Sequence, residues 1–387
     1  MLVGFLGGAS WLTPVLAQQA ITSAVPAQVV FIPDSGATAL SKHPSLPILY
    51  ACTTGDPNAS GLVTYRLNPD GSLADGGKKT YGQELFVVGT NTVFESVSLP
   101  PCVMAENKML LLASAPAHAG DYFADSNKNQ YAVLKLDDEG QPTKLVSAFC
   151  LNFTPQQPLM ATLWEPTTRR VYATYHAGVA LWFELGRDGC PLDKQGHALA
   201  IPPILHYWSL AYVPQWQRFF AMQTGVGGRI SIFRLTADGK GLDSFQSLHA
   251  VRGYYPSGSI TASPKFRKLY LLDNGPSDEL IVYPLTNEGR LTGVPRYFSL
   301  GQAVFIRFDF KGGLLYAFGK DGLLRIFELD DNGHPTGAPQ VFDLACGDIR
   351  DFLVDEHTGK VYIASTQSHR RDAAQRRRRA DQTAQAH

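Results

Sequence analysis

The sequence predicts an all-β fold, a seven-bladed β-propeller with four-stranded antiparallel blades, from three repeated features. The first is a phrase that occurs six times: an apolar segment ends in Leu and is followed by two residues, then an acid or Asn, then Gly. The glycines of this phrase are Gly71, Gly140, Gly189, Gly239, Gly289 and Gly333. The last five lie 49, 50, 50 and 44 residues apart, and a repeat of this size is typical of propeller blades.

Each copy of the phrase predicts the third strand of a blade followed by a tight turn. An aromatic or aliphatic residue stands two positions before the Leu, and the two share one face because side chains alternate along a strand. Three copies end in Asp–Gly and the others in Glu–Gly or Asn–Gly, which are turn signals because Gly accepts a positive φ. Six copies in near-constant register indicate a structural repeat.

The second feature is a short apolar strand that occurs seven times, before each phrase and once more near the C-terminus. Its copies contain Leu49-Tyr50, Leu110-Leu111, Val171-Tyr172, Phe219-Phe220, Leu269-Tyr270, Leu315-Tyr316 and Val361-Tyr362. We interpret these as second strands and expect the inner strands near residues 37–43, 94–99, 159–164, 209–213, 258–263, 303–309 and 348–354. Seven inner and seven second strands predict seven blades.

The third feature concerns the last blade. Residues 25–32 resemble residues 338–344, the outer strand after the sixth phrase, so the N-terminal segment is expected to supply the outer strand of the last blade and cover an exposed edge. The third strand of that blade is expected at residues 375–379, where the sequence has Gln375 and four arginines. Buried arginines would leave uncompensated charges, so the last blade is predicted to lack its third strand.

These features divide the chain into a β-propeller over residues 25–367 and a basic tail over residues 368–387. We interpret the tail as disordered or as sequence that is not native to the propeller; a basic address or a tail for an acidic partner is the alternative. Residues 1–17 are apolar, carry no charged side chain and end in Val-Leu-Ala, which predicts a signal peptide and a secreted or periplasmic protein. The alternative for this segment is a buried N-terminal strand.

Charge and hydropathy argue against several partners. Charged residues make up 18% of the chain, the formal net charge is zero and the propeller has no basic stripe, so no nucleic-acid partner is expected. After residue 17 no apolar run reaches the length of about 18 residues that a transmembrane helix needs. The histidines lack metal-binding spacing, and the loop with Asp125, Asn127 and Asn129 lacks the Gly and Glu of a calcium loop. We therefore predict no metal and no cofactor.

A site in a propeller is expected at the central channel, formed by the inner strands and the loops that lead into them. A base that activates water and a cation that stabilises an oxyanion are what hydrolysis of a lactone requires. The candidate catalytic residues are Glu95 and His206 as bases, and Arg307 and Arg350 as cations. In the alternative interpretation, Arg–Asp pairs on the inner strands neutralise each other and His206 is a structural histidine.

Aromatic residues near the same channel are candidates for ligand binding, because they stack on sugars and other flat ligands. These residues are Trp164, Tyr207, Tyr254 and Tyr255. They can equally well fill the channel with their own rings. The expected partner is a small-molecule or protein ligand at the central channel or at the blade loops.

The segment from His43 to Tyr50, together with Gly61 to Leu73, resembles a blade of the lactonase-type seven-bladed propellers. That family includes the propeller type of 6-phosphogluconolactonase, and similar blades occur in YVTN-type surface propellers. The resemblance covers residues 25–367 at the level of the blade pattern and implies a lactone hydrolase. No G-x-S-x-G or phosphate-binding loop occurs, so our first interpretation is an exported propeller that binds an unknown ligand, with a lactone hydrolase as the alternative.

Overall fold

The computed structural model describes residues 21–22, 29–31, 37–53, 61–74, 77–81, 102–104, 106, 108–113, 131–149, 151, 159–175, 180–193, 195–199, 207–223, 229–249, 259–273, 279–344 and 349–365. The predicted signal peptide at residues 1–17 and the basic tail at residues 368–387 lie outside these ranges and stay predictions, as does export. Among the described residues, no helix is long and apolar enough to cross a membrane.

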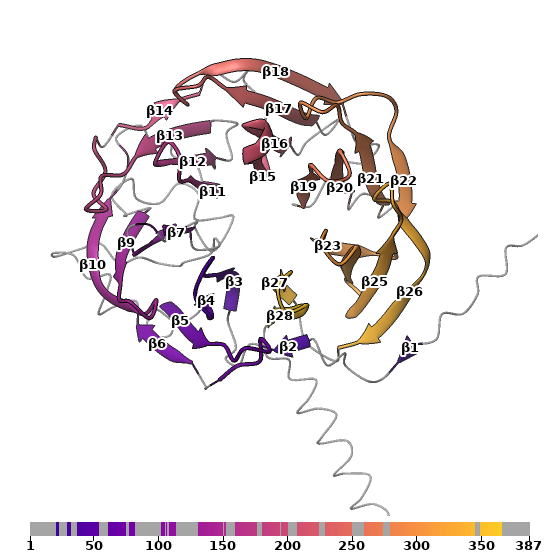
Figure 1. The fold of residues 1–387 in the computed structure, drawn as a ribbon, viewed down its shortest axis with the longest axis horizontal. Helices are drawn as coiled ribbons and strands as arrows, with labels where there is room; N and C mark the ends of the chain where they lie inside the picture. Colours follow the sequence, from indigo (N-terminus) through magenta and orange to yellow (C-terminus); the bar gives the residue numbers. More distant parts are fainter. Residues whose placement is uncertain are drawn as a thin grey trace, which may run out of the picture.

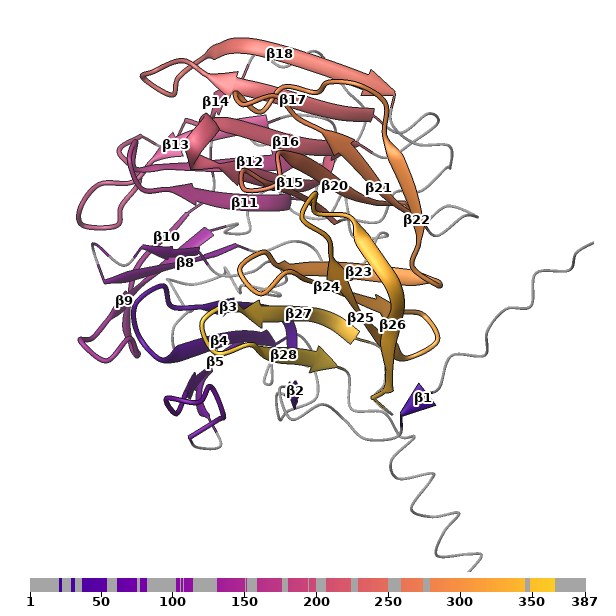
Figure 2. The same cartoon turned by 45° about the vertical axis from the view of Figure 1, so that its right-hand side comes forward.

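The described strands form sheets that are arranged in a ring around a common centre (Figure 1), and Figure 2 shows the same ring turned by 45°. Six sheets each contain four consecutive antiparallel strands, with the first strand of the four nearest the centre and the fourth on the outside. This confirms the predicted all-β propeller with four-stranded antiparallel blades. The count of seven blades stays a prediction.

The six sheets follow one another along the chain, and each begins with its inner strand. The first contains β3 (Ala37–Lys42), β4 (Ile48–Thr53), β5 (Gly61–Arg66) and β6 (Lys78–Tyr81). The second contains β7 (Cys102–Met104), β8 (Met109–Ala113), β9 (Tyr131–Leu136) and β10 (Pro142–Phe149). The third contains β11 (Leu159–Glu165), β12 (Arg170–Tyr175), β13 (Ala180–Glu184) and β14 (His197–Ala198).

The other three sheets repeat this order. The fourth contains β15 (Tyr207–Val213), β16 (Arg218–Gln223), β17 (Arg229–Leu235) and β18 (Leu242–His249), with the single-turn 3-10 helix η2 (Pro214–Trp216) in its first hairpin. The fifth contains β19 (Ile260–Ser263), β20 (Lys268–Asp273), β21 (Glu279–Pro284) and β22 (Arg296–Ser299). The sixth contains β23 (Ala303–Asp309), β24 (Leu314–Gly319), β25 (Leu323–Leu329) and β26 (Pro335–Asp343), and β1 (Ile21–Thr22) pairs with β26 in parallel.

A further sheet lies between the sixth and the first, and we call it the closing sheet. It consists of β27 (Ile349–Asp355), β28 (Lys360–Ser365) and β2 (Val29–Phe31). The N-terminal segment was expected in the outer position, but β2 pairs directly with β28 and in parallel, so it lies in the place of a third strand. The edge of β28 would otherwise leave N–H and C=O groups unpaired, which explains why a neighbouring strand covers it.

The hairpin that joins the first two strands has the same length in six sheets. The residue before the second strand has a positive φ and lies four residues after the end of the inner strand; these residues are Lys108, Arg169, Gln217, Arg267, Gly313 and Gly359. In the second sheet this spacing places the inner strand at β7, so the expected inner strand at residues 94–99 is wrong. Glu95 precedes β7 and lies outside the described residues.

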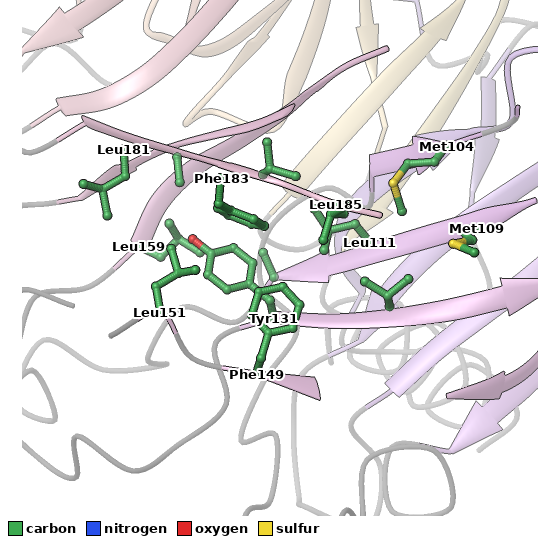
Figure 3. Close-up of a cluster of buried hydrophobic side chains, with 14 of the residues drawn as sticks. Met104, Met109, Leu111, Tyr131, Phe149, Leu151, Leu159, Leu181, Phe183 and Leu185 are labelled. Carbon is green, nitrogen blue, oxygen red and sulfur yellow. The ribbon is translucent and has the colours of Figure 1, made fainter. Parts of the chain in front are cut away.

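The hydrophobic core lies between neighbouring sheets. Figure 3 shows one such cluster, in which Tyr131 of β9, Phe149 of β10 and Phe183 of β13 pack together. The ring centroids of Tyr131 and Phe183 are 4.9 Å apart, and the edge of one ring faces the other, which is a favourable arrangement for two aromatic rings. Phe183 is the aromatic residue of the repeated phrase, two positions before Leu185. This residue therefore packs its own sheet against the preceding one, which explains why an aromatic or aliphatic residue recurs at this position of the phrase.

The six glycine turns of the phrase hold the sheets together through a hydrogen bond that we call the inter-blade latch. Each glycine has a φ between 68° and 80°, as predicted for these turns. A side chain of the preceding sheet donates to a backbone carbonyl of each turn at 2.5–3.2 Å; the pairs are Tyr50–Gly140, Ser147–Gly189, Tyr172–Gly239, Arg218–Glu288, Tyr270–Gly333 and Tyr362–Gly71. The bond between Tyr362 and Gly71 joins the closing sheet to the first sheet and so closes the ring.

A polar side chain at the end of the inner strand caps the first hairpin in several sheets. In the first sheet, Nδ1 of the buried His43 accepts hydrogen bonds from the N–H groups of Ser45 and Leu46, at 3.2 and 3.0 Å. Asp309 and Asp355 accept N–H hydrogen bonds in the corresponding turns, at 2.7 and 3.1 Å. Burial lowers the pKa of His43, which keeps the ring neutral and able to accept these bonds.

The cap at His43 predicts a loss of stability in mild acid. Its pKa is lowered in the folded protein, so the unfolded chain takes up the proton first and stability falls as the pH drops through about 6.5. A His43→Asp variant replaces the histidine cap with aspartate, the residue type that caps the same hairpin in the sixth sheet and in the closing sheet. Between pH 7.5 and 5.5 we expect the wild type to lose about 1 kcal/mol more unfolding free energy than this variant. Urea unfolding at both pH values measures the difference, and equal losses would contradict the role of His43.

Candidate functional site

Five of the described inner strands share an irregularity near their first residues. The register with the second strand shifts between Ala37 and Ala39, Leu159 and Ala161, Tyr207 and Ser209, Ala303 and Phe305, and Ile349 and Asp351. Such β-bulges re-aim a side chain and are frequent next to functional sites. Because the same order of strands repeats around the ring, these bulges lie at one end of it, which we call the leading end.

Arg350 is the extra residue of the bulge in β27. Its side chain is exposed, and it forms no ion pair with any described residue. The next residue, Asp351, is buried. The bulge therefore separates a cation that faces solvent from a carboxylate that faces the protein, at the leading end of the closing sheet.

Asp351 connects three neighbouring inner strands. Its Oδ1 accepts a hydrogen bond from the Arg307 guanidinium of β23 at 2.7 Å, and its Oδ2 accepts one from the N–H of Leu40 in β3 at 2.9 Å. The N–H of Phe352 also donates to Oδ1, at 2.8 Å. The carboxylate thus ties the sixth sheet, the closing sheet and the first sheet together on the channel side.

Asp351 and Arg307 differ in their exposure to solvent. The Asp351 side chain is 9% exposed and that of Arg307 35% exposed, so the guanidinium reaches solvent while its partner does not. Burial raises the pKa of Asp351, and the charge of Arg307 with the N–H donors of Leu40 and Phe352 acts in the opposite direction. Arg307 also donates to the carbonyl of Ile306 at 3.0 Å. Arg307 is therefore held in place and remains partly open to an anionic or carbonyl ligand.

The other acids on the described inner strands are engaged in turns. Glu165 accepts the N–H groups of Thr167 and Thr168, at 3.1 and 2.7 Å, and these bonds lower its pKa although burial acts against them. Asp309 caps the hairpin after β23, and Asp355 accepts a hydrogen bond from Lys42 at 2.6 Å. These carboxylates stabilise the inner hairpins.

The candidate residues fall into four groups by position, of which Trp164 alone is the fourth. Arg307 and Arg350 lie on neighbouring inner strands, β23 and β27. Tyr207 is the first residue of β15, and its side chain is not described. Glu95, His206, Tyr254 and Tyr255 lie outside the described residues.

Trp164 lies near the far end of β11, away from the leading end. It packs against the hydrophobic cluster between the second and third sheets, and the Arg169 guanidinium lies 5.9 Å from its ring centroid. Its side chain is half-buried. This environment is that of a core residue, and its ligand-binding role stays a prediction.

The sequence places Asp351 among the polar residues of the inner strands, but it does not reveal that this carboxylate contacts Arg307 and Leu40 of two other sheets. An Arg–Asp pair on the inner strands was expected as an alternative, but the two partners lie on different sheets, 44 residues apart. The sequence signal at this position is the adjacent charged pair Arg350-Asp351 near the start of the strand. Within the described ranges, no group of three or more His, Cys, Asp or Glu is placed to hold a metal ion.

Comparison with known proteins identifies the fold. No family model matches the chain, and no curated protein matches its sequence. Among solved structures, the periplasmic gluconolactonase of Pseudomonas aeruginosa superimposes with a TM-score of 0.59 at 15% identity, over 79% of this chain and 85% of that one. A Bacteroides fragilis protein and a Bacteroides uniformis protein, both provisionally named 6-phosphogluconolactonase, give TM-scores of 0.58 and 0.59 at 16% identity.

The two Bacteroides comparisons cover 78% and 80% of this chain, and 82% and 86% of the other proteins. The resemblance to lactonase-type propellers is therefore confirmed at the level of the fold. At these identities the likeness concerns the fold alone.

The geometry of Asp351 predicts an energetic coupling that is specific to Arg307. Removing the guanidinium in Arg307→Met leaves a buried carboxylate without its counter-charge, whereas Asp351→Asn removes the charge that needs it. A double-mutant cycle of these two variants is expected to show a coupling of about 1–2 kcal/mol in unfolding free energy, reduced from a fully buried pair because Arg307 is partly exposed. The matched cycle of Arg350→Met with Asp351→Asn is expected to show none. Equal couplings in the two cycles would contradict the assignment.

Proposed function

We propose that the protein is a lactone hydrolase whose site lies at the leading end of the central channel. The observation that carries this proposal is the fold that the chain shares with gluconolactonase over 79% of its length. The exposed Arg350 and the partly exposed Arg307 at the inner strands support it, because a hydrolase of this kind needs cations at the reacting carbonyl. The comparisons give no corresponding support to a binding module.

The chain order supports a common location for the candidate residues. His206 directly precedes β15, Tyr254 and Tyr255 precede β19, and Glu95 precedes β7. Each inner strand begins at the leading end of the ring, where Arg350 lies. Trp164 has no role in this proposal because it packs in the core at the other end.

In the proposed reaction, water adds to the lactone carbonyl carbon and the ring C–O bond breaks, which gives a hydroxy carboxylate. Glu95 or His206 accepts the proton of the attacking water and returns it to the ring oxygen as the C–O bond breaks. Arg350 stabilises the oxyanion, and Arg307, held by Asp351, contacts the carboxylate that forms.

We also propose that the closing sheet is the seventh blade. Its β27 continues the row of inner strands that runs from β3 to β23. The latch from Tyr362 to Gly71 links it to the first sheet in the same way as the other latches. Seven units in the ring agree with the seven predicted second strands.

The activity is tested with gluconolactone, which also hydrolyses spontaneously, by following acid release against a protein-free background. We expect a protein-dependent rate that falls about 100-fold or more in Arg350→Met, as for loss of one oxyanion-stabilising group. The matched control is Arg187→Met, an exposed arginine in the turn after β13, which should keep the wild-type rate. The absence of any rate above background in the wild type, or a fully active Arg350→Met, would refute the proposed function.

A further inference from the structure

The fourth sheet has two arginines side by side at a position where the third sheet has an arginine and a glutamate. In the third sheet, Arg170 begins β12 and pairs in register with Glu184 of β13, whose Oε1 accepts hydrogen bonds from Nε and Nη2 of Arg170 at 2.9 and 2.6 Å. In the fourth sheet, Arg218 begins β16 and pairs in register with Arg234 of β17. Like charges directly opposite each other destabilise a sheet, so the arginine pair is favourable only if negative charge lies beside it.

Arg218 is buried at 2% exposure, and no described carboxylate accepts a hydrogen bond from it. Its Nε donates to the Glu288 carbonyl at 2.5 Å, which is the latch of this sheet, and its Nη1 donates to the Ser244 hydroxyl at 3.1 Å. Its Nη2, the nitrogen that Glu184 binds in the equivalent Arg170, donates to no described residue and is not sealed from solvent. A buried guanidinium without a counter-charge is costly, so a negatively charged acceptor at Nη2 would stabilise it.

The side chain of Arg234 faces the fifth sheet together with that of Arg218. Phe220 of β16 and Ile232 of β17 pack in the cluster between the fourth and fifth sheets, and each arginine lies two positions from one of them, on the same face of its strand. The Arg234 side chain is 43% exposed, and its Nη1 lies 3.5 Å from Asp243 in an exposed ion pair. Its Nε is buried and has no hydrogen-bond partner. Arg234 therefore retains donors for a ligand at this junction.

The turn after β21 brings a third guanidinium to the same junction. Two contacts hold this turn against the fourth sheet. One is the latch from Arg218 to the Glu288 carbonyl, and the other is a hydrogen bond of 3.2 Å from the N–H of Leu291 to Oε1 of Gln246 in β18. Arg290 lies between the two anchored residues of the turn, and its exposed side chain bonds to no described residue.

The three guanidinium groups are close enough to act on one another. Burial lowers the pKa of Arg218, and the charges of Arg290 and Arg234 lower it further. The charges of Asp243 and Glu288 act in the opposite direction. Three cations and two acids leave an excess of positive charge at this junction, which lies at the end of the ring opposite the leading end.

We propose that Arg218, Arg234 and Arg290 form a binding site for a free tetrahedral oxyanion such as inorganic phosphate. One oxygen of the anion accepts a hydrogen bond from Nη2 of Arg218, as Glu184 does from its arginine in the third sheet. The other oxygens accept from Arg234 and Arg290. Guanidinium groups bind phosphate through charge-assisted hydrogen bonds, and a tetrahedral anion offers three cations more oxygens than a carboxylate does. Because Arg290 belongs to the fifth sheet, the bound anion links two sheets that the latch already joins.

The test compares the melting temperature of the full-length protein in inorganic phosphate and in sodium chloride of equal ionic strength. We expect about 20 mM phosphate to raise the melting temperature by about 2 °C over chloride, because a ligand that binds only the folded protein stabilises it. Isothermal titration calorimetry should show one saturable site per chain and a roughly tenfold weaker affinity for acetate. Equal melting temperatures in phosphate and chloride would overturn the proposal and make Asp243 and Glu288 sufficient counter-charges. Equal affinities for phosphate and acetate would also overturn it.

Two variants locate the site, and a third is their control. Arg234→Glu gives Arg218 the acidic neighbour that the third sheet has, so it should abolish the response to phosphate. Arg290→Met, at an exposed position, should weaken phosphate binding about tenfold, the loss of one charged hydrogen bond. The control is Arg66→Met, because Arg66 precedes the Leu of its phrase as Arg234 does but pairs with Glu139; it should keep the full response. A full response in either site variant, or its loss in the control, would overturn the proposal. The proposal does not depend on lactone hydrolysis, so its failure would leave that function untouched.

Discussion

The inter-blade latch is the interaction on which the ring depends. Each glycine turn presents a backbone carbonyl that the strands of its own sheet do not use, and a side chain of the preceding sheet donates a hydrogen bond to it. The same turn follows the third strand, whose aromatic residue packs against the preceding sheet. One repeated phrase thus supplies both the polar and the apolar contact between neighbours, which explains why its spacing is so regular.

The proposed site depends on the same closure. Asp351 of the closing sheet holds Arg307 of the sixth sheet and the backbone of Leu40 in the first, so the Arg307 guanidinium is held in this position only when the ring is closed. The closing sheet also has the shortest strand in the third position, β2, which consists of three residues. Closure of the ring and the proposed chemistry therefore depend on the same sheet.

Patterns among residues that are close together in the sequence predict most of the fold. The features that these patterns do not predict depend on contacts between residues that are far apart in the sequence. The second strands and glycine turns were predicted because apolar runs and Asp–Gly pairs act locally. The inner strand of the second sheet was misplaced at residues 94–99 because alternation mimics a strand, although the fixed spacing before Lys108 identifies β7. The parallel pairing of β2 and the contact of Asp351 with Arg307 have no local signal, since each joins segments that meet only after the ring forms.

The most direct test of this account compares the unfolding free energies of Tyr270→Phe and Tyr316→Phe. Both tyrosines are buried at the same strand position, but only Tyr270 donates to a glycine turn, at 3.0 Å from the Gly333 carbonyl. If the latches hold the ring, Tyr270→Phe leaves a buried carbonyl without a donor and costs about 1–3 kcal/mol, whereas Tyr316→Phe costs about zero. Equal costs for the two variants would contradict the account.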